Sequence, residues 1–127
     1  MKDSFIKIEE EYLKSIYTNH YYTPDVYFHS NYFVRWIFWK RLEIIYSMIS
    51  NLKNKNLDLC LDFGGGSGIF LPTLSKLFKK VVLIDLEPSQ SILIKERYNL
   101  DNCEIIKKNI FDYTDESFDF IIAADVL

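Results

Sequence analysis

All four glycines of this 127-residue chain fall within five positions, in the stretch LDLCLDFGGGSGIF from Leu57 to Phe70. Leucines and a phenylalanine alternate with other residues up to Phe63, and this run stops at Gly64. A short apolar run that ends in glycines is typical of a central parallel strand. Glycine tolerates positive φ and lets a ligand approach the backbone. The stretch therefore predicts a buried strand, a tight turn and the first turn of a helix.

A turn of this kind suits an anionic or strongly polar ligand. The helix N-terminus offers free N–H groups and a partial positive charge, and glycines remove the side chains that would block access to it. The dinucleotide fingerprint G-x-G-x-x-G/A fits poorly, because reading from Gly64 puts Ile69 at the third small position. The pattern D-x-G-x-G-x-G fits without a mismatch and comprises Asp62, Gly64, Gly66 and Gly68.

This pattern resembles motif I of the class I S-adenosylmethionine (SAM)-dependent methyltransferases. The resemblance implies that the glycine loop lies under the methionine part of SAM, and that the acid contacts the cofactor directly or through water. The residues expected in this part of the site are Asp62, Gly64, Gly65, Gly66 and Gly68. A nearby carboxylate also suits the cationic sulfonium and ammonium groups of SAM. Because the sulfonium is already activated, no metal ion is expected.

A second acid ends the next apolar run, VVLID, 17 residues after Gly68. A carboxylate at the end of such a strand can accept hydrogen bonds from both ribose hydroxyls. The resemblance identifies this residue, Asp85, as the motif II acid. The alternative is that Asp85 caps the helix that follows. The next residue, Leu86, is expected in the same cofactor site.

The resemblance also assigns two residues after the third predicted strand, 103–108, to the adenine ring. The family often has an acid here, whereas this chain has Asn109, whose amide oxygen can accept a weaker hydrogen bond. The backbone N–H of Ile110 is expected to meet the ring. Asp112 is a second candidate for the acid, although a turn residue before Tyr113 is the preferred interpretation.

The candidate catalytic residue is Asp125, which follows the fourth predicted strand in IIAADVL. In the family this position faces the methyl group and its acceptor, so Asp125 would position the acceptor or act as a general base; a solvated loop acid is the alternative. The [N/D]PP[Y/F] motif of methyltransferases that act on exocyclic nitrogens is missing. We therefore expect an O, N or C acceptor on a small molecule, lipid or glycan, rather than a base amine or glutamine.

Strands that alternate with helices predict an α/β fold with a parallel sheet. The resemblance implies a Rossmann-like sheet with the partial strand order 3-2-1-4 and helices on both faces. We expect an N-terminal helical and aromatic extension, 1–30, and the N-terminal part of a methyltransferase domain, 31–127. Ending after the fourth strand suggests a truncated copy, poorly soluble and inactive alone. The predicted strands are 57–63, 81–85, 103–108 and 118–124, and the helices between them are 68–80 and 88–99.

Two helices are predicted before the first strand, an amphipathic one over 1–18 and a mostly apolar one over 31–50. Asp3 or Ser4 would cap the first. The tyrosine-rich connector between them covers the edge of the core or acts as a lid. The second helix is too interrupted by charges to span a membrane, and packing on the sheet is the preferred interpretation. The alternative is contact with a membrane surface through Trp36, Phe38 and Trp39, with Arg35, Lys40 and Arg41 at the headgroups.

The composition excludes several function classes. A net charge of −3 argues against a general nucleic-acid surface. Cys60 and Cys103 are each expected to be free buried thiols in a reducing compartment, and no spacing typical of a structural zinc site is present. The N-terminus lacks a signal-peptide h-region, so a cytoplasmic protein is expected. An NAD(P)- or FAD-dependent Rossmann enzyme and a non-catalytic interaction or membrane-associated module are the alternative functions.

Overall fold

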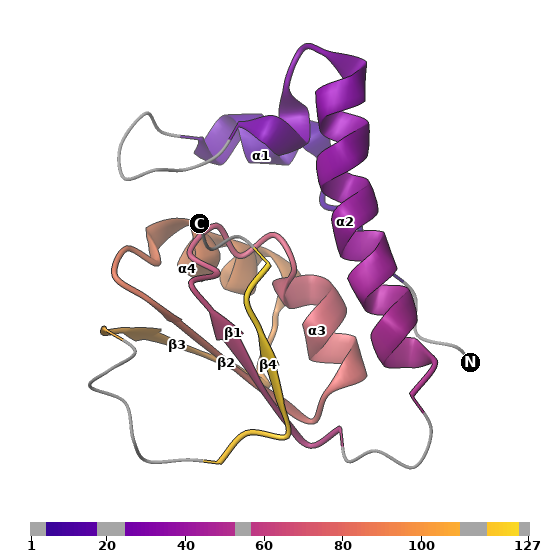
Figure 1. Cartoon of the computed structure of the whole chain (residues 1–127). Helices are drawn as coiled ribbons and strands as arrows, with labels where there is room; N and C mark the ends of the chain where they lie inside the picture. The colour runs from indigo at the N-terminus through magenta and orange to yellow at the C-terminus, as the bar shows by residue number, and fades with distance from the viewer. Residues whose placement is uncertain (1–4, 18–24, 53–56, 110–116, 125–127) are drawn as a thin grey trace.

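The computed structural model describes residues 5–17, 25–52, 57–109 and 117–124. A four-stranded parallel sheet with the order β3-β2-β1-β4 forms its centre (Figure 1). The strand order confirms the predicted Rossmann-like α/β fold. The strands are β1 (Leu59–Phe63), β2 (Lys80–Asp85), β3 (Cys103–Lys107) and β4 (Phe120–Ile122).

The register of the sheet brings the carboxyl ends of the strands to one edge. Asp62 of β1 lies opposite Leu83 of β2 on one side and Ile122 of β4 on the other. Asp85, the last residue of β2, lies opposite Lys107 of β3. The glycine loop after β1 therefore lies beside the segments that follow the other strands, at the edge where open α/β sheets bind their ligands.

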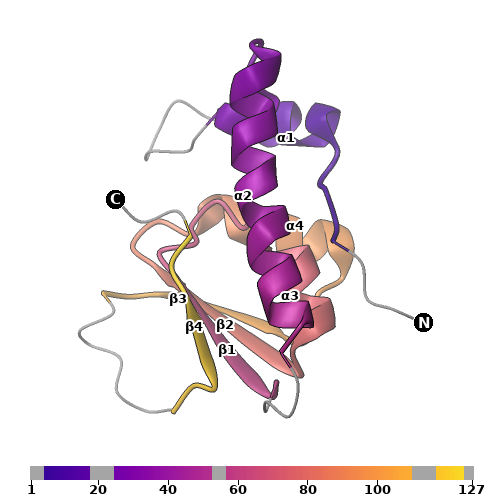
Figure 2. The same ribbon diagram turned by 45° about the vertical axis from the view of Figure 1, so that its right-hand side comes forward.

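The helices that contact the sheet pack on one face. They are α2 (Tyr32–Ser50), α3 (Leu71–Leu77) and α4 (Ser89–Tyr98), and Figure 2 shows them on the same side. Their buried residues form one hydrophobic cluster with Cys60, Val81 and Leu83. The opposite face has a smaller cluster around Val82, built from strand residues and Phe118. We expected helices on both faces of the sheet. Among the described residues, helices cover one face only.

The helix predicted over 31–50 is confirmed, with its start at Tyr32. The side chain of Asn31 caps it by accepting a hydrogen bond from Phe33 N at 2.8 Å. The inward face buries Trp39, Leu42 and Ile49, whose spacing follows one side of a helix. Packing on the sheet, the preferred interpretation, is therefore correct.

Several residues that the membrane-surface alternative requires on the outside of α2 are buried or turned inward. Trp39 is 4% exposed, and Phe38 is half-buried against the hydrophobic cluster. The Arg41 guanidinium turns inward and donates from Nη1 to Ala124 O at 2.8 Å. Trp36 does point outward, with 48% of its surface exposed. No helix among the described residues is long and apolar enough to cross a membrane.

The helix expected over 1–18 is wrong in its first half. The observed helix, α1, covers only Glu10–Ile16 and is followed by a short 3-10 turn, η1 (Val26–Phe28). The chain before α1 is held by long-range contacts, because Ile6 N donates to Thr73 Oγ1 at 2.9 Å. The Phe5 ring packs against Trp39 at 6.1 Å. The proposed caps Asp3 and Ser4 lie outside the described residues.

Two other predicted boundaries were too wide. The helix after the glycine loop begins at Leu71, not Gly68, because the turn itself uses the residues in between, and it ends at Leu77 so that Lys80 can enter β2. β4 covers Phe120–Ile122, not 118–124.

The connector residue Tyr27 is 1% exposed, which supports a core-covering role for this ring. Tyr21 and Tyr22 lie outside the described residues.

Both cysteines are free and buried, as predicted. Burial raises the pKa of the Cys60 thiol, and the negative charge of nearby Asp62 raises it further. Burial also raises the pKa of Cys103, to about 11. The two thiols therefore stay protonated and shielded at neutral pH.

We expect an aromatic disulfide reagent at pH 8 to label neither cysteine in the folded protein and both after denaturation. Fast labelling of the native protein would contradict this expectation, and Cys103→Ser would then show which thiol had reacted.

The raised pKa values also set the sign of a pH effect on stability. Above the ordinary thiol pKa of 9.0 the unfolded chain loses these protons first, so the free energy of unfolding should fall as pH rises from 9.0 toward about 11.

Candidate cofactor-binding site

The glycine loop makes a tight turn between β1 and α3. Gly64 and Gly68 have φ values of 67° and 72°, in the left-handed region that favours glycine. Gly64 N donates to Ile84 O at 2.9 Å, and Gly68 N donates to Gly65 O at 2.7 Å. The first bond ties the loop to the end of β2, and the second closes the turn.

Both predicted acids pack directly against this loop. A Cβ on Gly65 would lie 2.4 Å from Oδ2 of Asp62, and a Cβ on Gly66 would lie 2.8 Å from the carboxyl carbon of Asp85. Real Cβ atoms do not approach other atoms so closely, so these two positions accept only glycine unless the acids move. Asp62 is buried, with 4% of its surface exposed. The structure thus brings together the loop and both acids that the spacing singled out.

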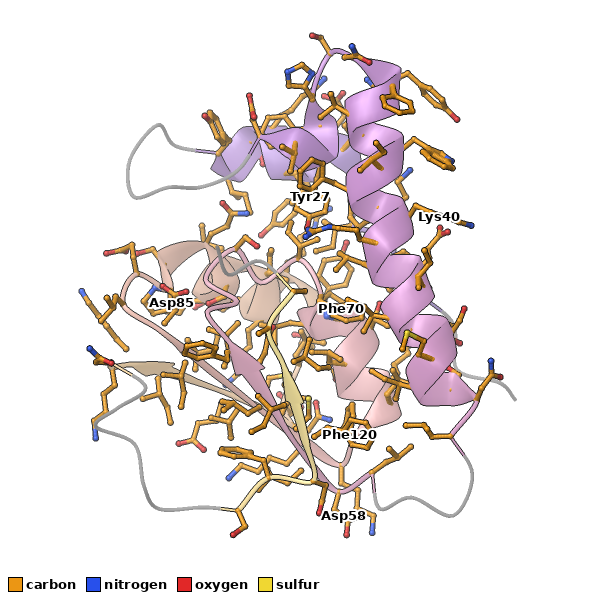
Figure 3. All side chains as sticks on the ribbon, in the orientation of Figure 1. Tyr27, Lys40, Asp58, Phe70, Asp85 and Phe120 are labelled. Atoms are coloured by element: carbon orange, nitrogen blue, oxygen red, sulfur yellow. The ribbon has the colours of Figure 1, made fainter. Side chains whose placement is uncertain are left out.

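Asp85 binds the loop through its side chain (Figure 3). Its Oδ2 accepts a hydrogen bond from Gly66 N at 3.0 Å, and its Oδ1 accepts one from Glu87 N at 2.8 Å. Each carboxylate oxygen has a further lone pair, so a half-buried Asp85 keeps acceptor capacity for two ligand hydroxyls. The helix-cap alternative is wrong, because the N-cap of α4 is Pro88 and no side chain caps that end.

The remaining predicted residues are described in part. Leu86 follows Asp85 and is 65% exposed. Lys108 N donates to Asp85 O at 3.1 Å, which puts the next residue, Asn109, at the same edge of the sheet, with an exposed side chain. Ile110, Asp112 and Asp125 lie outside the described residues.

The described part of the chain contains no group of three or more His, Cys, Asp or Glu side chains arranged to hold a metal ion. What it offers is a glycine cradle with two carboxylates. Carboxylates attract a cationic ligand and accept hydrogen bonds from hydroxyls. SAM has both kinds of group, so the residues present fit this cofactor.

Three side chains near the site escaped the motif analysis. Arg41 Nη2 donates to Tyr27 Oη at 3.1 Å, while Nη1 binds Ala124 O just before Asp125. Ser67, inside the glycine loop, and Gln90, on α4, are buried polar residues. The motifs specify only glycines and acids, so no signal in the sequence distinguished these three from surface residues.

We expect Gly66→Val to abolish detectable binding of S-adenosylhomocysteine (SAH), while β1 and α3 still form. A side chain at this position would displace the Asp85 carboxylate and fill the space above the loop. Isothermal titration calorimetry measures the binding, and circular dichroism measures the fold. Ser47→Val, at an exposed site on α2, is the control. SAH binding by a folded Gly66→Val protein would show that the ligand does not lie over this loop.

Comparisons with known proteins agree with this site. A model of the methyltransferase domain family matches residues 61–127, which is more than half of the chain. The ribosomal RNA small subunit methyltransferase A of Mycoplasma capricolum subsp. capricolum is 28% identical over 71 residues, which cover 56% of this chain and 27% of that protein.

Two solved structures share the fold. The N-methyltransferase NodS from Bradyrhizobium japonicum WM9, in complex with SAH, matches with a TM-score of 0.57 and 19% identity, over 88% of this chain and 54% of that one. The YcgJ protein from Bacillus subtilis matches with a TM-score of 0.54 and 16% identity, over 65% of this chain and 36% of that one. The chain spans about half the length of NodS, and a smaller share of the YcgJ protein and of the ribosomal RNA methyltransferase.

The family match begins within β1 and includes the glycine loop, Asp62 and Asp85. The predicted family is therefore confirmed on the same residues that carry the resemblance to motif I. The chain belongs to the family of SAM-dependent methyltransferase domains.

Proposed function

We propose that this chain binds SAM at the glycine loop and acts in methyl transfer to a small-molecule acceptor. The observation that carries the proposal is the contact between Gly66 and Asp85, in which a loop amide and a strand-end carboxylate meet at 3.0 Å. This contact fixes two of the predicted ligand-binding groups relative to each other before any ligand arrives.

Each half of the cofactor has residues to bind it. The loop residues and Asp62 would bind the methionine half, where the buried carboxylate offsets the ammonium and sulfonium charges. Asp85 would accept hydrogen bonds from the ribose hydroxyls. Leu86, Asn109 and the N–H of Ile110 would contact the adenine ring. The bound sulfonium supplies an activated methyl group, so the protein contributes mainly by positioning the acceptor in line with it.

The acceptor side is expected at the end of β4. Arg41 binds the carbonyl of Ala124, which connects α2 to the residue before Asp125. Asp125 remains the candidate for acceptor positioning or proton removal.

A small molecule is favoured over RNA as the acceptor. The net charge of −3 argues against a general phosphate-binding surface, and the residues after β4 do not match the motif of enzymes that methylate exocyclic base amines. The ribosomal RNA methyltransferase matches over 56% of this chain, so RNA is the acceptor that the experiment must distinguish from a small molecule.

Binding and transfer are tested separately. We expect calorimetry to detect SAH binding, and NADH fluorescence to show no response. Protein expressed from its natural reading frame is then incubated with methyl-labelled SAM and cell extract, and we expect the label in the low-mass fraction. Label in RNA would contradict the small-molecule acceptor. NADH binding without SAH binding would favour another Rossmann enzyme, and binding of neither would favour a non-catalytic module.

A further inference from the structure

α2 is apolar on two opposite faces, and the described residues bury only one of them. Its inner face packs into the core through Trp39, Leu42 and Ile49. The other face exposes five large apolar side chains along the helix: Phe33, Trp36, Ile37, Ile44 and Met48. Together with Lys40 they recur at intervals of three or four residues, so they share one side of the helix. We call these six residues the outer stripe.

The outer stripe is a continuous surface rather than a set of scattered residues. Phe33, Ile44 and Met48 are 61%, 52% and 65% exposed. The rings of Phe33 and Trp36 stack with their centroids 6.2 Å apart. Figure 1 shows α2 along one side of the molecule, and Lys40 in Figure 3 points away from the sheet. Contiguous exposed apolar patches mark interaction sites, so we ask what partner fits this one.

The shape of the outer stripe favours a flat partner. A helix of 19 residues is about 28 Å long and roughly 10 Å wide, so one face covers on the order of 300 Å². Stable protein complexes bury about 800 Å² on each partner. A lipid surface sets no such minimum, because a helix that lies in its plane inserts one narrow apolar face.

The charge of α2 specifies the kind of lipid. In a chain with a net charge of −3, this helix has three basic residues and one acid: Arg35, Lys40, Arg41 and Glu43. Lys40 lies within the outer stripe and pairs with Glu43 at 3.5 Å, and both side chains are nearly half exposed. A surface pair of this kind contributes little free energy, so a lipid phosphate can replace Glu43 as the partner of Lys40.

We infer that the outer stripe of α2 binds the surface of a membrane that contains anionic phospholipids. The apolar side chains insert below the headgroups, and Lys40 binds a phosphate. Tyr32 and Trp36, at one end of the helix, are residue types enriched where membrane meets water. The surface differs from the one suggested by the sequence, of whose three aromatic residues only Trp36 belongs to the outer stripe. The inference goes beyond the proposed function and does not depend on it.

The test is flotation of the protein with vesicles of phosphatidylcholine, with and without phosphatidylglycerol. We expect tighter binding to the anionic vesicles. Trp36→Gln combined with Ile44→Gln should weaken this binding about 10-fold or more, because both changes remove apolar area from the lipid. Lys40→Gln should weaken it about 5-fold, as for one basic residue near an anionic surface. All three positions are exposed, so the melting temperature should stay unchanged.

Two matched controls lie on other helices. Ile92→Gln combined with Leu93→Gln changes two apolar side chains of α4 that are 44% and 42% exposed, against 48% and 52% for Trp36 and Ile44. Lys76→Gln changes an exposed lysine of α3. Both controls should bind vesicles as wild type does.

Fluorescence locates the contact within the helix. The chain has two tryptophans, and the second, Trp39, is 4% exposed in the core. Brominated phosphatidylcholine in the anionic vesicles should therefore quench mainly Trp36. Trp36→Phe keeps an aromatic ring in the outer stripe, so it should still bind vesicles while most of the quenching disappears.

Several results would overturn the inference. They are absence of vesicle binding, equal binding to neutral and anionic vesicles, and unchanged binding by Trp36→Gln with Ile44→Gln. A dimer that these two changes dissociate, without vesicle binding by wild type, would instead assign the outer stripe to a second copy of the chain. All of these variants should bind SAH as wild type does. If wild-type protein fails to bind SAH, the proposed function fails and the vesicle test still decides this inference.

Discussion

Asp85→Ala should weaken SAH binding by about 1.5–3 kcal/mol, the range for hydrogen bonds to a charged group. Two losses contribute to this value. The variant cannot accept from the ribose hydroxyls, and it no longer binds Gly66 N and Glu87 N, which Asp85 holds at 3.0 Å and 2.8 Å. Calorimetric titration of wild type and variant with SAH measures the difference.

An analogue of SAH without the ribose 2′-hydroxyl separates these two contributions. If Asp85 contacts that hydroxyl, the analogue binds wild type more weakly than SAH does, and Asp85→Ala binds both ligands equally. Asp101→Ala, which removes an exposed acid after α4, should leave both affinities unchanged. Wild-type affinity for SAH in Asp85→Ala would eliminate the ribose assignment.

The parallel sheet could be predicted from sequence because its signals are local and agree with one another. Each strand is a short apolar run, the glycine turn after β1 has a spacing that few ligands fit, and Asp85 stands at the end of the next run. Parallel strands place such residues at one edge. The order β3-β2-β1-β4 then follows from the resemblance and is the order observed.

The N-terminal segment could not be predicted in the same way. The spacing of Phe5, Ile8 and Tyr12 fits a helix, yet the helix begins only at Glu10. Ile6 bonds instead to Thr73, which is 67 positions away, and Ile8 is 1% exposed in the shared core. Contacts over that distance leave no trace in local periodicity, so they overrode it here.

The glycines illustrate a second limit. Their clustering correctly indicated a tight turn after β1, but the sequence suggested that they are needed for the ligand itself. In the structure, Gly65 and Gly66 are required first by Asp62 and Asp85, whose carboxylates occupy the space of their missing side chains. The acids and the loop are thus one unit, and a substitution in the loop changes the site by moving an acid.

This distinction predicts different outcomes for two loop glycines. At Gly66 the obstacle is the carboxylate of Asp85, the movable end of a side chain, so Gly66→Ala should keep the fold and lose affinity. At Gly68 the obstacle is the Cα of Ser91, 2.7 Å from the new Cβ, and the residue also has a φ of 72°. Neither the backbone of α4 nor this φ can adjust without disturbing the packing of Ile94 beneath it.

Gly68→Ala should therefore lower the free energy of unfolding by about 2–5 kcal/mol, from left-handed backbone strain of roughly 1–2 kcal/mol and overpacking of roughly 1–3 kcal/mol. That is a large share of the total stability of a small domain. Urea unfolding followed by circular dichroism measures the change, with Gly66→Ala as the matched control. An unfolding midpoint like that of wild type would mean that the loop and α4 can separate in solution, and the close contact between them would not be a requirement of the fold.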